Sequence, residues 1–228
     1  MYFYKREDIK ATSKYNDVVK EELSGDGYLD ALLTGVPKNA RNTYDYDHKN
    51  CLFQTGGRTE KRLCRCLTLY KTEKAECDKC VLKGNPFFAK KVLNANMIDF
   101  EIPVSKDGKD AVGEIDLLIE YESVLYCAEF KPIWNGESLL RMVAEILTYT
   151  YVWESGDRTA FDRKYNSYGK EIKKAILFME GSEQYKQWTD KGYAYYAKDG
   201  LRRIIKEQEI AVLVLRQKEG DYVIEKLN

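Results

Sequence analysis

Two apolar segments in the middle of the chain carry charged residues at strand spacing. The first spans residues 113–119 and the second residues 124–131. Side chains two positions apart share one face of a strand, so Glu129 and Lys131 are expected to project together. A two-residue turn between the segments brings Asp116 close to them. Two carboxylates and an ammonium at the ends of apolar strands are costly unless a ligand binds them, and a hard divalent cation fits such a group.

The periodicity of the chain indicates an α/β protein. Strands are predicted at 97–104, 112–121, 124–130, 210–215 and 222–226, residues 175–179 form a short apolar run, and helices are predicted at 15–23, 28–33, 85–93, 137–153, 183–196 and 201–206. The helix at 137–153 has an apolar stripe that is expected to pack on the sheet. Its opposite side carries Glu137, Arg141, Glu145 and Tyr149.

The charge of the chain is balanced, with 37 lysines and arginines against 37 aspartates and glutamates. There is no overall basic field, so any surface for nucleic acid has to be local. The sequence shows no apolar stretch of about eighteen residues and no secretory signal in its first residues. We therefore expect a soluble, cytoplasmic protein.

The composition divides the chain into three parts. Residues 1–50 are polar with short helices, residues 51–83 form a cysteine-rich and basic insert, and residues 84–228 carry the regular elements. The insert has eight basic residues, of which six crowd the cysteines: Arg58, Lys61, Arg62, Arg65, Lys71 and Lys74. They could hold phosphates beside a catalytic site or form a solvated surface.

Five of the six cysteines lie in this insert, and four of them form two close pairs. The candidate metal ligands are Cys64, Cys66, Cys77 and Cys80, with Cys51 and His48 nearby. Thiolates favour zinc or an iron–sulfur cluster over magnesium or calcium, and the reducing cytosol disfavours disulfides. We expect structural zinc first, an iron–sulfur cluster as the alternative, and unliganded thiols or a redox pair as the third reading. Cys127 stands alone in a strand and is expected to be an ordinary buried thiol.

Asp116, followed by Glu129-Phe130-Lys131, resembles the signature of the PD-(D/E)XK nuclease superfamily. The run from Gly113 to Asp116 is similar to the Gly-x-x-Asp motif of RecB-like members. The resemblance covers residues 97–153.

Glu145-Ile-Leu-Thr-Tyr149 lies where RecB-like members have a second motif, Gln-x-x-x-Tyr. Glu145 in place of glutamine is a departure from that motif. Ile115 stands where the proline that names the superfamily is found, which is a second departure.

The resemblance implies a restriction endonuclease-like core, in which a central mixed β-sheet is flanked by helices, with the cysteine-rich insert on its N-terminal side. The implied catalytic residues are Asp116, Glu129, Lys131, Glu145 and Tyr149. Asp116 and Glu129 would hold Mg²⁺ or Mn²⁺, and Lys131 would act as the catalytic base or stabilise charge at phosphorus. Glu114, Glu21 and Glu22 are candidates for a second metal ion.

The expected function is a metal-dependent nuclease that hydrolyses phosphodiester bonds, with DNA as the expected partner. One alternative is a domain with the nuclease fold but without catalytic activity, which binds nucleic acid or protein through the insert that a metal ion stabilises. The structural alternative is that these residues form a surface ion pair, which contributes about 0 to 1 kcal/mol. Against it, Asp116 and Glu129 both interrupt apolar runs, and buried carboxylates with perturbed pKa values concentrate at functional sites. The sequence leaves open whether the substrate is DNA or RNA, whether it is single or double stranded, and whether it is cut at its ends or internally. It also leaves open whether the protein forms a homo-oligomer or joins a larger repair or defence complex.

Overall fold

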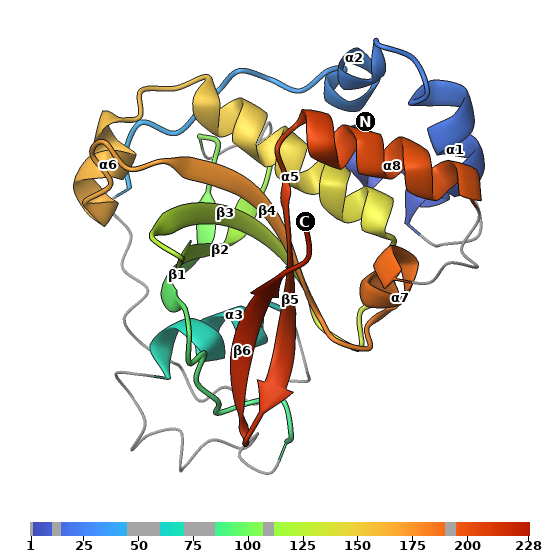
Figure 1. Cartoon of the computed structure of the whole chain (residues 1–228). Helices are drawn as coiled ribbons and strands as arrows, with labels where there is room; N and C mark the ends of the chain where they lie inside the picture. Colours follow the sequence, from blue (N-terminus) through green and yellow to red (C-terminus); the bar gives the residue numbers. More distant parts are fainter. Residues whose placement is uncertain (1, 11–14, 45–59, 71–84, 107–111, 190–194) are drawn as a thin grey trace.

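A six-stranded mixed sheet forms the centre of the molecule (Figure 1). The computed structural model describes residues 2–10, 15–44, 60–70, 85–106, 112–189 and 195–228. The strands are β1 (Asn96–Pro103), β2 (Glu114–Tyr121), β3 (Val124–Lys131), β4 (Ile172–Met179), β5 (Ala211–Lys218) and β6 (Asp221–Lys226), and they lie in the sheet in chain order. β1 to β3 are antiparallel neighbours, β3 to β5 run parallel, and β6 returns antiparallel.

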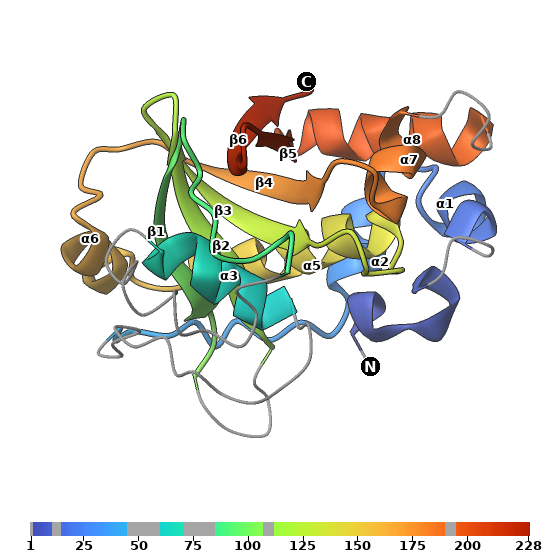
Figure 2. The same ribbon diagram turned by 90° about the horizontal axis from the view of Figure 1, so that it is seen from below.

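Helices cover both faces of this sheet (Figures 1 and 2). They are the 3₁₀ turns Phe3–Lys5 and Glu7–Ile9, α1 (Tyr15–Glu22), α2 (Tyr28–Leu33), α3 (Glu60–Leu69), α5 (Leu139–Glu154), α6 (Thr159–Tyr165), α7 (Glu183–Thr189) and α8 (Tyr195–Glu207). Parallel neighbours need a crossover connection. The segment with α5 and α6 connects β3 to β4, and α7 and α8 connect β4 to β5. α3 lies on the face of the sheet opposite to α5.

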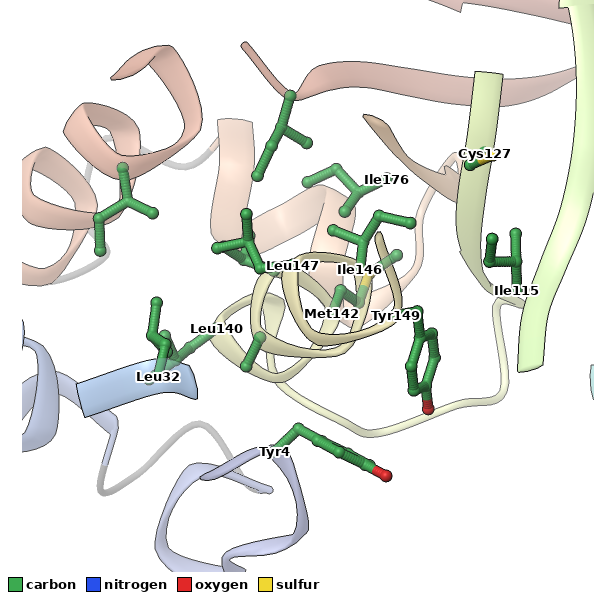
Figure 3. Packing of buried hydrophobic residues seen from close by; sticks show 14 of the residues in the cluster. Tyr4, Leu32, Ile115, Cys127, Leu140, Met142, Ile146, Leu147, Tyr149 and Ile176 are labelled. Atoms are coloured by element: carbon green, nitrogen blue, oxygen red, sulfur yellow. The ribbon is translucent and has the colours of Figure 1, made fainter. Parts of the chain in front are cut away.

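The alternation of side chains along the strands builds one apolar cluster on each face of the sheet. Cys127 and Ile176 point toward α5, where Met142 and Ile146 pack against the sheet (Figure 3). Their neighbours in sequence belong to the second cluster, which includes Leu63, Cys64 and Leu67 of α3. The sheet is therefore buried on both sides, which is why residues 124–128 of β3 and 175–179 of β4 are continuously apolar.

The predicted α/β fold, a mixed sheet flanked by helices, is confirmed. The predicted helix at 85–93 is wrong: this segment consists of turns and bends, and Ala89 has a positive φ of 57° that interrupts a right-handed helix. The predicted helix at 183–196 corresponds to all of α7 and the first two residues of α8. α6 was not predicted.

The cysteine-rich segment 51–83 contains a regular element that its polar composition concealed. Within it, α3 buries Leu63, Cys64, Cys66 and Leu67 against the sheet. The domain boundaries themselves stay a prediction. None of the helices in the described ranges has the length and hydropathy needed to cross a lipid bilayer.

Candidate metal centre

β2 and β3 separate at the end of their ladder, and Asp116 occupies the opening. The paired residues end with Leu117 opposite Ala128. One position further, the backbone N–H of Phe130 donates to the Asp116 carboxylate at 2.9 Å instead of to a main-chain carbonyl. Continuing this register by one position places Asp116 opposite Glu129, and the bond from Phe130 fixes the Asp116 carboxylate there.

A third carboxylate reaches the same place from α3. Glu60, the first residue of that helix, has a carboxylate oxygen within 4.8 Å of those of Asp116 and Glu129. The three acids form the one group of potential metal ligands found among the described residues. Three carboxylates at this spacing are a suitable oxygen ligand set for a hard divalent cation.

Sequence reasoning missed Glu60. It proposed Glu114, Glu21 or Glu22 as the additional acid, yet Glu22 on α1 accepts hydrogen bonds from Arg6 at 2.6 and 2.8 Å. Glu114 pairs with Lys61 at 2.5 Å. The available signal was an acidic residue in the first turn of an amphipathic helix, but Glu60 precedes Lys131 by 71 positions and no local pattern joins them.

The ammonium of Lys131 lies at the centre of the acidic groups. Its Nζ atom is 2.7 Å from Glu129 Oε1, 3.1 Å from Glu60 Oε1, 3.3 Å from Glu137 Oε2 and 3.3 Å from Glu145 Oε2. The Lys131 side chain is 3% exposed. The expected pairing of Glu129 and Lys131 on one face is thus observed, and the lysine is too deeply enclosed to be a surface ion pair.

α5 contributes its polar side to the same site. The helix begins after Ser138, whose hydroxyl accepts a hydrogen bond from the Arg141 N–H at 3.1 Å. One turn later, Arg141 Nε donates to Glu145 Oε1 at 3.1 Å, and Arg141 Nη1 lies 3.2 Å from Glu137. Glu145 and Tyr149 are both buried. These two side chains therefore do not belong to a solvated charged surface of α5.

The packing of Tyr149 explains why a glycine stands at position 113. A Cβ atom on Gly113 would lie 2.7 Å from Tyr149 Cε1, a distance that real Cβ contacts do not reach. Gly113 also has a φ of +157°. Tyr149 is held from its other side by the ring of Tyr4, 5.6 Å away in an edge arrangement (Figure 3). The two sequence motifs, around Asp116 and around Tyr149, are thus in direct contact.

The loop between β3 and α5 ties α3 to the sheet. Asn135 Nδ2 donates to Glu60 Oε2 at 3.0 Å, and Asn135 Oδ1 accepts from the Glu137 N–H at 2.7 Å. The backbone carbonyl of Asn135 accepts from Gln184 at 3.2 Å. Asn135 therefore holds the carboxylate of Glu60 in place from the opposite element.

The electrostatics of these groups show strong crowding of negative charge. Burial raises the pKa of Glu129 well above its usual range, and the charge of Asp116 adds to the effect. Burial also raises the pKa of Glu60 to about 8 and that of Asp116 above its usual value. Burial alone would raise the pKa of Glu145, but Lys131 holds it below its usual value. The cluster has more negative charge than Lys131 and Arg141 neutralise.

These groups line a cavity of about 500 Å³, which we call the acidic cavity. Its charged lining residues are Glu60, Glu114, Asp116, Glu129, Glu137, Glu145, Lys61, Lys131 and Arg141. Six carboxylates thus face three cations. The buried Glu129 Oε2 has no hydrogen-bond partner among the described residues. An oxygen in that state is costly without a cation or water, so the residues fit a divalent metal ion.

The cysteines have a different environment. Cys64 and Cys66 lie on α3 and are buried as thiols in the apolar cluster under the sheet, and Cys127 is a buried thiol as expected. Burial raises the pKa of Cys64 well above its usual value, which opposes a thiolate. Cys51, Cys77, Cys80 and His48 lie outside the described residues. The zinc or iron–sulfur site therefore stays a prediction, and metal analysis of the purified protein would test it.

Part of the basic insert is engaged by acidic partners. Lys61 pairs with Glu114, and Arg65 lies 3.9 Å from Glu101 and 5.4 Å from the centre of the Phe100 ring. Arg58, Lys71 and Lys74 lie outside the described residues. A phosphate-holding role for this insert stays a prediction.

No family model matches the sequence, and no curated protein matches it. A comparison with solved structures finds similarity to the structure of Pyrococcus furiosus SfsA in complex with Ca²⁺, at 16% sequence identity and a TM-score of 0.24. The match covers 68% of this chain and 58% of that chain, so the chain spans less than two thirds of the length of that structure. A TM-score this low adds nothing to the assignment of fold or function, which rests on the geometry of the acidic cavity.

Proposed function

We propose that this protein is a metal-dependent nuclease of the PD-(D/E)XK type that hydrolyses phosphodiester bonds in DNA. The observation that supports it most is the convergence of Glu60, Asp116 and Glu129 within 4.8 Å, where the buried Glu129 Oε2 has no hydrogen-bond partner in the described part of the chain. A buried acidic group of this kind is more typical of a functional site than of a structural one. Lys131 stands beside it, as the family signature requires.

Asp116 and Glu129 would hold Mg²⁺ or Mn²⁺, and Glu60 would complete the protein ligands. When bound, such an ion neutralises charge on a phosphodiester and lowers the pKa of a coordinated water. The ligand oxygens are already oriented: Asp116 by the Phe130 N–H and Glu60 by Asn135. This preorganisation would limit the motion that the side chains need on binding.

Lys131 would act on the substrate side of the cluster. Its ammonium is hydrogen-bonded to Glu129 and Glu60, so it is held at a fixed position between the ligand residues and α5. From there it would orient the attacking water or stabilise negative charge on the phosphate. Arg141 holds Glu145, which would keep the ammonium in place from the helix side. Replacing Lys131 by arginine separates the two roles, since arginine keeps the charge and cannot act as a base.

The test is cleavage of linear and circular DNA and of RNA, single and double stranded, with Mg²⁺, Mn²⁺ or EDTA. We expect divalent-dependent cleavage, and a loss of at least about 100-fold in Asp116→Asn and Glu129→Gln, because removing a ligand costs several kcal/mol at the transition state. Glu120→Gln is the matched control, since that acid also lies on β2 but pairs with Lys170 at 3.2 Å. Undiminished cleavage in Asp116→Asn would remove the proposal.

The same assay decides the alternative of a degenerate, binding-only domain. That alternative predicts no cleavage of any of these substrates in either metal, together with nucleic-acid binding that Asp116→Asn leaves unchanged. Complete Asp116, Glu129 and Lys131 side chains in contact around one cavity support the catalytic reading over it.

A further inference from the structure

A second cavity lies between α7, α8 and the chain segment that follows β6, and we call it the basic cavity. Its volume is about 530 Å³, nearly that of the acidic cavity. Its charged and aromatic lining residues are Lys173, Trp188, Arg202, Lys206, Glu209 and Lys226. Four cations therefore face one acidic side chain, in a chain whose lysines and arginines equal its acids in number.

The four cations come from three elements. Lys173 lies on β4, Arg202 and Lys206 lie one turn apart on α8, and Lys226 lies on β6. α8 and β4 are fixed by the apolar cluster that Ile205 and Ile210 share with Ile176 and Phe178, and β6 is fixed by its pairing with β5. The positions of the cations around the hollow are therefore set by the fold.

Two of these cations are available to a ligand and one is already oriented. Lys206 and Lys226 are exposed, and within the described residues neither forms an ion pair. The Arg202 guanidinium lies over the Trp188 ring, 4.8 Å from its centre, and donates to the Trp188 carbonyl at 3.2 Å. Lys173 pairs with Glu171 at 3.1 Å. An arginine stacked on an aromatic ring presents its remaining donors in a fixed plane, which suits phosphate oxygens.

We propose that the basic cavity binds backbone phosphates of the nucleic acid whose scissile bond lies in the acidic cavity. The inference rests on the proposed nuclease function and adds a second contact surface for its substrate. A polyanion suits the site because several phosphates can meet several cations at once and release their counterions.

The two cavities lie toward opposite ends of the parallel strands. Lys131 is paired with Phe178 on β4, and Lys173 precedes Phe178 by five positions. At a rise of about 3.3 Å per residue, the sites are about 17 Å apart along the strand. This corresponds to about five base-pair steps of B-form DNA. A substrate therefore has to extend at least that far beyond the scissile bond to contact both.

The experiment measures binding of a duplex of about 30 base pairs by fluorescence anisotropy in EDTA, across a range of salt concentrations. The test variant is Lys206→Gln/Lys226→Gln. The matched control is Lys20→Gln/Lys218→Gln, which removes two exposed lysines that line neither cavity. Both variants have the same net charge, so a difference between them reports position.

We expect the test variant to bind at least about fivefold more weakly near 0.1 M salt, and its slope of log K against log salt to be less steep by about 1.8, or about 0.9 per lost contact. The control should keep the affinity and slope of the wild type. Equal effects of the two variants, or no effect of the test variant, would overturn the proposal. So would displacement of the duplex by inorganic phosphate but not by chloride of equal ionic strength, which indicates a small-anion pocket.

Because binding is measured without metal, this result is independent of cleavage. Weaker binding of the test variant in a protein that cuts nothing supports the basic cavity and removes the nuclease. Unchanged binding of the test variant in a protein that cuts DNA supports the nuclease and removes the basic cavity as a phosphate site. If the test variant binds more weakly and the wild type also cleaves DNA, a duplex too short to reach the basic cavity should be cleaved equally by the wild type and the test variant.

Discussion

The acidic and the basic cavity have nearly equal volumes and opposite charge, and they differ most in how their side chains are held. In the acidic cavity, Glu129, Lys131 and Glu145 are buried and contact one another. In the basic cavity, Lys206 and Lys226 are exposed and engaged by no carboxylate among the described residues. Chemistry at one bond needs groups fixed to within a fraction of an ångström, whereas attraction of a polyanion needs charge in the right region.

The sharpest way to break this comparison is to compare the stability cost of removing the buried lysine of the acidic cavity with that of removing an exposed, ion-paired lysine that lines neither cavity. Lys131→Met leaves buried carboxylates without their cation, so we expect the free energy of unfolding to fall by about 3 to 5 kcal/mol. Urea denaturation measures it. Lys170→Met, which breaks the exposed pair with Glu120, is the control and should cost at most about 1 kcal/mol. Equal losses in both variants would mean that the acidic cavity is no more than a surface ion pair.

Asn135 tests whether the fixed geometry serves a metal ion. In Asn135→Ala the Glu60 carboxylate loses its hydrogen bond, and we expect Mn²⁺ affinity to fall about 10- to 100-fold in titration calorimetry. Asn94→Ala also removes an asparagine that joins distant segments, here by bonding the backbone of β6, and should leave Mn²⁺ affinity unchanged. The same affinity in wild type and Asn135→Ala would contradict the role given to Glu60.

Gly113 tests the contact between the two motifs. In Gly113→Ala the new Cβ meets the Tyr149 ring, so we expect a loss of about 1 to 3 kcal/mol in unfolding free energy. Gly25→Ala, with no atom within 4 Å of its added Cβ, should change stability by less than about 0.5 kcal/mol. A Gly113→Ala variant as stable as Gly25→Ala would show that Tyr149 does not pack there.

The smallest effect on stability is expected in the basic cavity. Lys206→Gln removes an exposed charge, so the unfolding free energy should change by less than about 0.5 kcal/mol, whereas the salt slope of DNA binding should lessen by about 0.9. Stability by urea denaturation and binding by anisotropy are measured on the same preparation. A large loss of stability in Lys206→Gln would mean that the charge is part of the packed structure.

The parts of the molecule that were predictable are those with a local signal. The pairing of Asp116 with Glu129 and Lys131 follows from strand periodicity and one short turn, and the structure brings these residues together. The helix that carries Glu145 follows from its apolar stripe. Both rest on residues close in sequence, where the geometry of a strand or a helix decides which side chains meet.

The remaining parts depend on tertiary contacts that no local pattern encodes. α3 lies in a polar segment, and its role becomes visible only when its apolar side packs under the sheet and places Glu60 beside Lys131. The basic cavity assembles from β4, α8 and β6, whose cations are unremarkable one by one. The segment 85–93 fails as a helix because Phe87 and Phe88 pack on Trp134 instead of along a helical stripe.

The central claim, a divalent cation held by Glu60, Asp116 and Glu129, is tested most directly by anomalous diffraction from crystals grown with Mn²⁺. The account predicts a strong anomalous peak in the acidic cavity, within about 2.0 to 2.3 Å of carboxylate oxygens of Asp116 and Glu129, and its loss in Asp116→Asn. Crystals of the wild type at saturating Mn²⁺ with no peak there, and with Lys131 still in contact with the carboxylates, would contradict it.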